Sequence, residues 1–505
     1  MTAAGKHTYG QILKSSVLVG GASIVNIGIG IVRTKAMALW LGPSGFGLMG
    51  LYGSILNFAQ AIAGMGINSS GVRQIAAAAG SGDTQRIAKT AAVLRRTAIF
   101  LGLLGAFLLV VLCKPVSKLS FGNYDHAIPI ALLSLAVFFG SVSGGQGALI
   151  QGMRRIGDLA KMGVLGGVYG AVISVVLVYF FRKQGIVPSL IAIAATSVLM
   201  SWWFSRKVKF ETPPMSASQI GHEAGGLLKL GFAFMASGML IMGAAYVVRI
   251  IIVRKIGFDA AGLYQSAWTL GGLYIGFILQ SMAADFYPRL SAAVQNHSEC
   301  NRLVNEQAQI SLLLAGPGVI ATLTFAPLVI ALFYSAKFYA AVAILRWICL
   351  GATFQVITWP MGFIVVATGR QKLFFGCELA YTAVYLGLAW VCISYFGLAG
   401  AGIAFFGSYV FHGVLIYPCV RWLTGFRWSA ANRRTGMVFL TSTGLVFGSF
   451  YVLPFWLATT VGLLAALGSG IYSARILVRL VPMDRMPHLL RQLLVWLRIA
   501  PSGNI

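Results

Sequence analysis

Stretches of about 20 apolar residues follow one another along almost the whole 505-residue chain. A helix of that length crosses the hydrocarbon core of a bilayer, where helices and closed barrels alone satisfy their own backbone hydrogen bonds. Counting such stretches between turn and charge signals predicts about fourteen transmembrane helices in an all-α polytopic membrane protein. Their approximate ranges are 15–40, 45–66, 90–112, 127–150, 160–181, 186–205, 231–254, 262–286, 307–334, 340–367, 373–396, 399–420, 435–453 and 456–478.

The composition supports this class and argues against others. Hydrophobic residues make up 58% of the chain and charged residues only 10%, against roughly 45–50% and 25% in soluble domains. A net charge of +27 would suit nucleic acid, but the cations sit in short clusters between apolar stretches, so we expect no nucleic-acid partner. The six cysteines show no CxxC spacing and are interpreted as small buried hydrophobes.

Loop charges predict the orientation. Most of the 38 Lys and Arg residues fall on the side that holds the N terminus, so both termini are expected in the cytoplasm and the protein in a bacterial inner membrane. The first 14 residues are polar or weakly basic and do not resemble a cleavable signal peptide. Loops on the opposite side are short, which disfavours a catalytic domain outside the cell.

The predicted domain organisation has five parts. A six-helix lobe (1–205) is followed by a cytoplasmic amphipathic linker (206–230), a second six-helix lobe (231–425), two additional helices (426–480) and a tail (481–505). The tail is predicted to form an interfacial helix on the inner leaflet, with a frayed tail as the alternative.

Charge spacing indicates that the two lobes are copies of one another. Asp83 lies 10 residues after Arg73, and Glu299 lies 10 residues after Arg289. Apolar helices align easily by accident, but spaced loop charges do not. Because each copy has an even number of helices, the lobes are predicted to be parallel and to surround a central cavity, with the last helix pair as an appendage.

The run from Thr34 to Tyr52, TKAMALWLGPSGFGLMGLY, resembles the first two helices of lipid-linked oligosaccharide (O-antigen) flippases. These form the polysaccharide-transporter branch of the multidrug/oligosaccharidyl-lipid/polysaccharide exporter superfamily. Residues 12–16, 227–231 and 262–264 are similar to the same family in order. The resemblance extends to about residue 425; family members with twelve helices lack the segment 435–478.

The resemblance implies a function, which is to move an undecaprenyl-pyrophosphate-linked glycan from the inner to the outer leaflet by alternating access. It implies a transporter rather than an enzyme, in lipopolysaccharide O-antigen biosynthesis, with membrane lipids, a polysaccharide polymerase and chain-length proteins as further partners. A polyanionic headgroup cannot cross the hydrocarbon core without replacement of its hydration, which a cationic cavity would supply.

Four cations in or near apolar spans are candidates for binding this headgroup. A lipid-facing cation at mid-bilayer costs about 2.5–3.5 kcal/mol on insertion scales, so these side chains should face the cavity or reach back to the headgroups, which is the alternative. Arg binds phosphate in a bidentate manner, which favours Arg33 and Arg249 over their neighbours. The four are Arg33, Lys35, Arg249 and Arg254.

Three amides, Asn26, Asn57 and Gln60, are candidates for hydrogen bonds to sugar hydroxyls, with bonding between helices as the alternative. Tyr264, Trp268 and Tyr274 could stack on sugar rings, although ordinary core or belt packing is the favoured explanation.

Two carboxylates in apolar spans, Asp285 and Glu378, are candidates for coupling transport to a H⁺ or Na⁺ gradient. The alternative for Asp285 is an ion pair with Arg289, four residues later. Cytoplasmic gate candidates are Arg73, Arg289, Arg154 and Arg370, with simple inside-positive topology as the alternative.

No catalytic or metal-ligand constellation stands out, and no resident cofactor is expected. Three other functions remain open: a multidrug/cation antiporter of the same superfamily, a lipid II flippase, and a membrane glycosyltransferase or polymerase. An antiporter would need acidic cavity residues, and a glycosyltransferase would need a large outer loop.

Overall fold

The computed structural model describes residues 3–80, 83–208 and 215–480. For residues 3–20 and 217, 230, 233, 234, 236, 237, 277, 281, 283–285 and 288 it describes only the backbone. Within these limits the chain is helical and divides into two compact units. The first unit comprises residues 1–262 with 333–335, and the second comprises 263–332 with 336–505.

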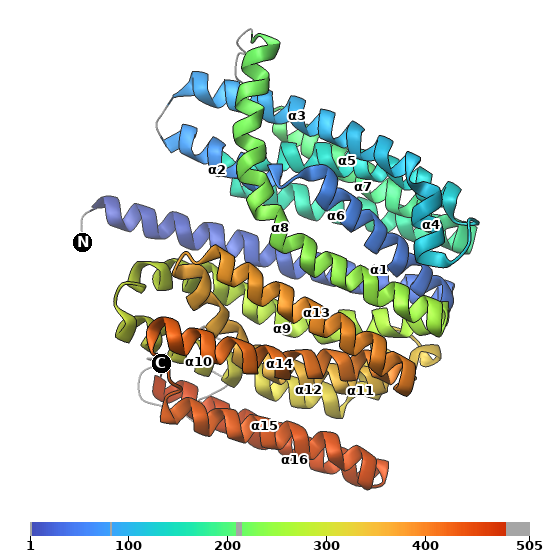
Figure 1. The fold of residues 1–505 in the computed structure, drawn as a ribbon, viewed down its shortest axis with the longest axis vertical. Helices are drawn as coiled ribbons and strands as arrows, with labels where there is room; N and C mark the ends of the chain where they lie inside the picture. The colour runs from blue at the N-terminus through green and yellow to red at the C-terminus, as the bar shows by residue number, and fades with distance from the viewer. Residues whose placement is uncertain (1–2, 81–82, 209–214, 481–505) are drawn as a thin grey trace. The chain divides into compact units, whose positions relative to one another are not determined.

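The first unit begins with two spans that a glycine separates. Helix α1 (Ala3–Gly64) loses helical geometry at Gly42, whose φ of 63° favours glycine, and Pro43 follows. The remaining helices are α2 (Ile67–Gly80), α3 (Thr84–Val111), α4 (Cys113–Phe121), α5 (Ala127–Gly152), α6 (Ile156–Phe181), the short η1 (Arg182–Gly185), α7 (Ile186–Ser205) and α8 (Ala217–Lys255) (Figure 1). Helices α3, α5 and α7 pack in series, and α6 packs against α7 and α1.

Helix α8 begins earlier than the sequence suggests. We expected a linker over 206–230, but a capping box at Ser216 starts the helix: the Gln219 backbone N–H donates to the Ser216 hydroxyl at 3.3 Å, and the Gln219 side chain accepts from the Ser216 N–H. The helix then packs against α1, α2, α3 and α4 of the first unit. The division between units therefore falls after Gly262, beyond α8, and not at the expected linker.

The second unit begins within α9 (Phe258–Ala293), and its helices pack mainly around α12 and α14. Its other helices are α10 (His297–Thr324), α11 (Ala326–Phe333), η2 (Ala336–Phe338), α12 (Ala341–Ala367), α13 (Gln371–Phe396), α14 (Ala399–Thr424), α15 (Ala430–Val452) and α16 (Phe455–Leu480). Helix α14 packs against α12 and α13, and α10 packs against α12. A core that includes Phe286, Val304 and Ile364 fills the space between them.

The last helix pair attaches to α10. A side chain at Gly316 of α10 would collide with the Phe439 ring of α15, and one at Gly462 of α16 would collide with Thr324, so these glycines let the helices approach closely. At one end of the pair, the Asn432 amide of α15 donates to the backbone carbonyl of Asn305 at 2.7 Å and to its side-chain oxygen at 2.9 Å. These contacts attach the pair to α10 at several points along its length.

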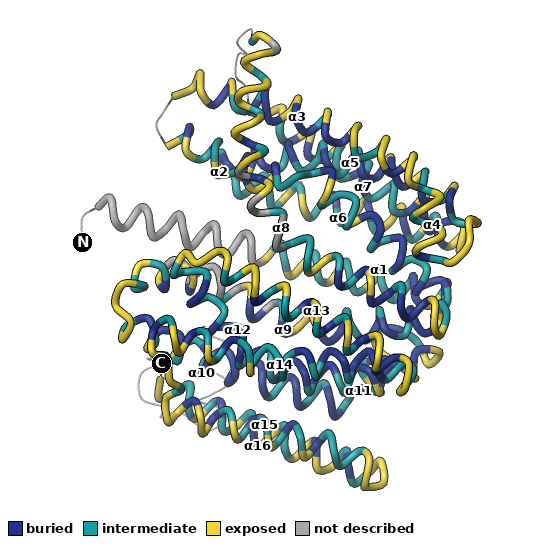
Figure 2. The backbone as a smooth tube through the Cα atoms, in the orientation of Figure 1, coloured by how far each residue is buried: buried dark blue, intermediate teal, exposed yellow. Residues whose placement is uncertain are grey.

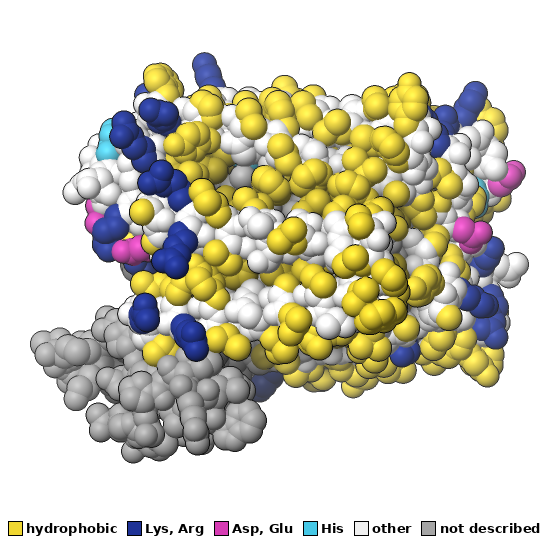
Figure 3. Space-filling model, turned by 90° about the horizontal axis from the view of Figure 1, so that it is seen from below, with side chains coloured by type: hydrophobic (Ala, Val, Ile, Leu, Met, Phe, Trp, Pro, Cys, Tyr) yellow, Lys and Arg dark blue, Asp and Glu magenta, His cyan; other side chains and the backbone are white. Residues whose placement is uncertain are grey.

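Ten helical stretches of the described residues are long and apolar enough to cross a membrane. Helix α12 is largely buried, whereas most of α16 is exposed or half-buried (Figure 2). On the face drawn in Figure 3, hydrophobic side chains cover most of the helices, and Lys and Arg gather near the helix ends. The interfacial helix predicted for 481–505 lies outside the described residues.

Corresponding helices in the two halves have matching lengths. Helices α3 and α10 each contain 28 residues, and α6 and α13 each contain 26. The residues that precede α6 and α13, Arg155 and Arg370, have nearly identical backbone angles (φ −80°, ψ 62° and φ −80°, ψ 66°). This agreement supports an internal duplication in which α8 is the first helix of the second copy.

Candidate functional site

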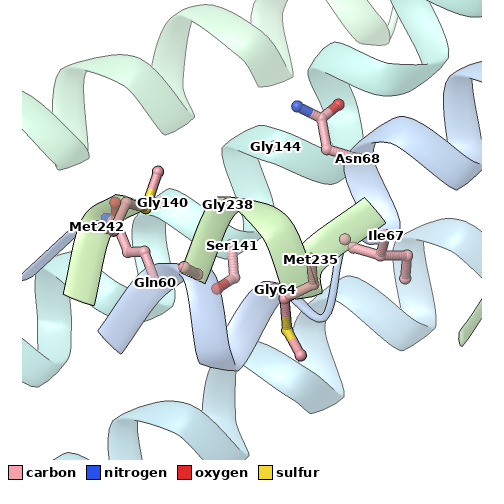
Figure 4. A pocket seen from close by; sticks show the side chains of 12 residues that line it. Gln60, Gly64, Ile67, Asn68, Gly140, Ser141, Gly144, Met235, Gly238 and Met242 are labelled. Atoms are coloured by element: carbon pink, nitrogen blue, oxygen red, sulfur yellow. The ribbon is translucent and has the colours of Figure 1, made fainter. Parts of the chain in front are cut away.

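A pocket of about 350 Å³ lies within the first unit. The end of α1, the start of α2 and the middle parts of α5 and α8 form its walls (Figure 4). Its size falls at the lower end of the range for ligand pockets, about 300–1,000 Å³. The lining residues are Gln60, Ala61, Gly64, Gly66, Ile67, Asn68, Gly140, Ser141, Gly144, Met235, Gly238 and Met242.

Close backbone approaches shape this pocket. The Gln60 amide donates to the Ala136 carbonyl of α5 at 3.1 Å. It occupies the space in which a side chain at Gly140 would lie, since a Cβ there would be 2.2 Å from the Gln60 nitrogen. Where α8 passes the turn between α1 and α2, a Cβ at Gly66 would lie 2.0 Å from the Gly231 carbonyl oxygen. These contacts join α1, α5 and α8, which are three of the four helices that form the walls.

The pocket lining is mostly apolar and includes three polar side chains that carry no charge. Among its described lining residues, Gln60, Asn68 and Ser141 contribute amide and hydroxyl groups, and none is ionisable. The carboxyl end of α1 and the amino end of α2 meet here, so the opposite partial charges of the two helix ends lie next to one another. Amides and hydroxyls can both donate to and accept from sugar hydroxyls. The lining therefore suits a polyhydroxyl group inside a membrane-spanning unit.

Three lining glycines leave open space. A Cβ added at Gly64, Gly144 or Gly238 would meet no atom within 4 Å. Larger side chains at these positions would fill the pocket without displacing its walls, which makes them suitable for testing its use.

The candidate binding residues of α1 differ in their burial and in their contacts. Arg33 is half-buried and makes no hydrogen bond or ion pair to a residue that the structure describes. Lys35 is also half-buried but has a partner. Asn26 lies against α6, because a Cβ at Gly167 would be 2.8 Å from its side-chain oxygen. Asn57 is exposed, and Gln60 is the one predicted amide that lines the pocket.

The α8 cations bond to backbone oxygens. Arg249 is only 9% exposed, and its guanidinium donates to the Ala245 carbonyl one turn earlier at 2.8 Å. Arg254 donates to the Lys118 carbonyl at the end of α4. Near it, the hydroxyls of Tyr246 and Ser120 lie 2.5 Å apart. The end of α8 is thus tied to α4, and neither arginine lines the pocket.

The four gate candidates are all exposed. Arg73 and Arg154 lie on the surface of the first unit, and Arg289 and Arg370 lie on the surface of the second. The Arg370 guanidinium sits 4.7 Å from the centre of the Trp422 ring.

The carboxylate candidates fall in the second unit. Glu378 is half-buried in α13, one turn before Tyr381. The side chain of Asp285 lies outside the described residues, so its expected ion pair with Arg289 cannot be placed. Tyr264 is buried beside Trp268, with ring centroids 5.7 Å apart, and the Tyr274 hydroxyl donates to the Leu314 carbonyl at 2.6 Å.

Sequence reasoning missed most of the pocket. Asn68, Ser141 and the two methionines were not singled out, because charge was taken as the sign of a site. The available signal was the run GSVSGG at 140–145, which places Gly140 and Gly144 on the same helix face at a spacing of four.

Comparison with known sequences identifies the family. The family described as polysaccharide biosynthesis protein matches residues 36–343, more than half of the chain. The chain belongs to this family. The flippase resemblance seen in residues 34–52 is thereby confirmed.

Two curated relatives of this chain are named as a flippase and a putative transporter. The lipid III flippase of Escherichia coli (strain K12) is 22% identical over 417 residues, which cover 79% of this chain and 96% of that protein. The putative O-antigen transporter of Shigella flexneri is 22% identical over 404 residues, which cover 78% and 94%. Both relatives are named as a flippase or a transporter and not as enzymes.

Solved structures show the same fold. The lipid II flippase MurJ in an inward closed conformation aligns with a TM-score of 0.70 at 15% identity, covering 92% of this chain and 100% of that one. An inward-facing multidrug resistance transporter of the MATE family aligns with a TM-score of 0.64 at 17% identity, covering 80% and 99%. The chain is therefore an all-helical, multi-pass membrane protein.

Proposed function

We propose that this protein flips a lipid-linked oligosaccharide across the bacterial inner membrane. The observation that carries the proposal is the family match over 36–343, together with relatives of named flippase and transporter function that the chain covers almost completely. The uncharged polar side chains in the pocket of the first unit support it, because a sugar headgroup needs hydrogen-bond partners within the apolar spans.

The proposed topology has fourteen crossings with both termini in the cytoplasm. Of the ten apolar stretches, Gly21–Gly64 and Ile156–Ser205 each contain two helical segments, and α8 and α9 complete the set. In this topology the pocket lies in the cytoplasmic half of the membrane, on the side from which the substrate is loaded. The two copies, 1–205 and 231–425, form parallel lobes around a central cavity.

Headgroup binding is divided between two kinds of group. The pocket hydrogen-bonds the sugar through Gln60, Asn68 and Ser141, while Arg33 and the other cations of α1 and α8 bind the undecaprenyl pyrophosphate. Arg33 is the strongest candidate, since it is half-buried in a span without a described partner. The exposed arginines at 73, 154, 289 and 370 attract the anionic headgroup to the cytoplasmic surface, and Glu378 is a candidate for binding a coupling ion.

Lipid II is a second candidate cargo. The lipid II flippase shares the fold of this chain over 92% of the chain's length, including part of the region of the last helix pair. Both cargoes are lipid-linked sugars, and a flipping assay in proteoliposomes, run with each lipid, distinguishes between them.

The test is a flipping assay in proteoliposomes with Gly144→Leu. Leucine fills open space in the pocket, so we expect flipping of the lipid-linked oligosaccharide to fall at least tenfold while the protein folds normally. The matched control is Gly387→Leu, at an exposed and equally open position of α13, which should flip at the wild-type rate. Wild-type protein that moves neither an O-antigen lipid nor lipid II contradicts the proposed function.

A further inference from the structure

A histidine inside the second unit lacks a hydrogen-bond partner. His412 lies within α14, and its Nδ1 atom is fully buried with no partner among the described residues. Buried polar atoms are nearly always paired, so an unpaired one calls for an explanation. Because histidine changes charge near physiological pH, an unpaired ring nitrogen is a candidate for taking up a proton.

Tyrosines surround this imidazole. The Tyr381 ring of α13 lies 5.4 Å from it and the Tyr409 ring lies 6.1 Å from it, measured between ring centroids. The Ser408 hydroxyl lies 3.5 Å from the Tyr381 hydroxyl. Glu378 precedes Tyr381 by one helical turn, and the Tyr385 ring is stacked 6.3 Å from Tyr381 on the other side. Helix α13 therefore contributes Tyr381 and Glu378 to this region, and α14 contributes Ser408 and Tyr409.

The described side chains that the other helices bring near this site are uncharged. Helix α12 contributes Thr358 beside Gly413, and its single charged residue, Arg346, lies twelve residues away along the helix. Helix α9 contributes Tyr264, whose hydroxyl lies 3.4 Å from that of Tyr385. Helix α10 bonds to α14 at Thr424, three turns from His412. The titratable groups that face the imidazole are thus tyrosines, with Glu378 as the nearest carboxylate along α13.

In the conformation described, the imidazole is neutral. A protonated ring has an N–H on each nitrogen, and Nδ1 faces no acceptor here. A proton bound at Nδ1 would be stable only after a tyrosine hydroxyl or the Glu378 carboxylate turned toward it. Tyr409 lies on α14 with His412, whereas Tyr381 and Glu378 lie on α13, so a proton held between the imidazole and either α13 group would tie the two helices together.

We propose that His412, with Tyr381, Tyr409 and Glu378, forms a proton-binding site whose occupancy changes the packing of α13 against α14. The link from this site to flipping rests on the proposed function; proton binding itself does not. This arrangement would let a proton gradient drive one half of the transport cycle, because the protonated and neutral sites favour different conformations.

Proton binding is tested by potentiometric titration of the purified full-length protein from pH 8 down to pH 3.5. Wild type should take up one more proton than His412→Gln. The double variant Tyr381→Phe/Tyr409→Phe, which keeps the imidazole but removes both hydroxyl acceptors, should shift that uptake to lower pH. The control His297→Gln removes an exposed histidine and should leave the His412 proton in place. Coincident curves for wild type and His412→Gln would overturn the proposal.

Coupling is tested in proteoliposomes with an imposed pH difference. We expect the gradient to change the wild-type and His297→Gln flipping rates at least threefold, and the His412→Gln rate not at all. A gradient response in His412→Gln equal to that of wild type overturns the coupling. Wild type that binds the proton but flips no lipid-linked sugar contradicts the proposed function instead, while the titration still supports the proton site.

Discussion

At the scale of single residues, a substitution of Arg33 tests whether cations bind the pyrophosphate as proposed. Arg33 is half-buried in an apolar span and has no described partner. Each charge-assisted hydrogen bond to a pyrophosphate contributes about 1.5–3 kcal/mol, so its loss should deplete the occupied state roughly ten- to hundredfold. We expect Arg33→Ala to reduce flipping to that extent, and Arg33→Lys to keep part of it, because Lys retains the charge without the planar fork.

The measurement is flipping by purified variants that insert and elute like wild type. Arg249→Ala is expected to reduce flipping as well. If both alanine variants flip at the wild-type rate, the pyrophosphate does not depend on these cations.

His126 gives a pH dependence at the same scale. Its Nδ1 lies 2.7 Å from the Tyr52 hydroxyl, and its ring is stacked 3.9 Å from Phe121. Burial lowers the pKa of His126, and the Asp125 carboxylate offsets part of this effect. Below about pH 6.5 the unfolded chain therefore binds a proton that the folded protein resists. Stability should be fully present above this pH and decrease as the pH falls through it.

We expect the midpoint of thermal unfolding in detergent to drop between pH 7.5 and pH 5.5, and to drop less in His126→Phe, which keeps the stacked ring. Tyr52→Phe removes only the hydroxyl and should lower the midpoint at pH 7.5. An identical pH profile for His126→Phe and wild type would show that other groups set the dependence.

At the scale of elements, the last helix pair depends on Asn305. Its side-chain oxygen accepts from the Ser429 backbone N–H at 2.8 Å and from Asn432, and its amide donates to the Asn301 carbonyl at 2.9 Å. Asn305→Ala should remove these hydrogen bonds at a cost of about 0.5–1.5 kcal/mol each.

We expect Asn305→Ala to expose the α14–α15 connection to limited proteolysis and to lower the unfolding midpoint. Asn123→Ala, at an exposed loop position whose side chain makes no described hydrogen bond, is the control and should behave like wild type. Equal cleavage of both variants would mean that packing at Gly316 and Gly462 holds the pair without the amide.

The elements were largely predictable from sequence, because length and hydropathy alone define a crossing. The boundary at Gly42 agrees with the expected break between the first two spans. The register of the repeat was less predictable from the sequence. The charge spacing paired Asp83 with Glu299, but the residue that caps α3 is Asp83 and the one that caps α10 is Asn296. Glu299 instead pairs with Arg302 at 2.6 Å.

The pocket was harder to predict, because its walls come from four helices far apart in the chain. Gln60 was singled out as an amide in a span, but nothing local indicates that Gly140 leaves room for it. Side-chain charge, the guide used on the sequence, does not apply to a lining of amides, hydroxyls and glycines.

For the whole molecule, the fourteen-crossing topology predicts which loops face outside. In a cysteine-free background, Asn123→Cys between α4 and α5 should react with a membrane-impermeant maleimide in intact spheroplasts. Ser216→Cys, before α8, should react only after permeabilisation. The reverse pattern at either position would contradict the proposed number of crossings.

The attachment of α8 to the first unit has a consequence for biogenesis. The residues that close the pocket, Met235 to Met242, are synthesised only after the whole first copy has been inserted. Until then Gln60, Asn68 and Ser141 face the bilayer without their fourth wall, and α4 lacks its bonds to Tyr246 and Arg254. A nascent chain that ends at the 206–216 connection is therefore an incomplete domain. We expect it to stay associated with the membrane insertion machinery and to be degraded when released early.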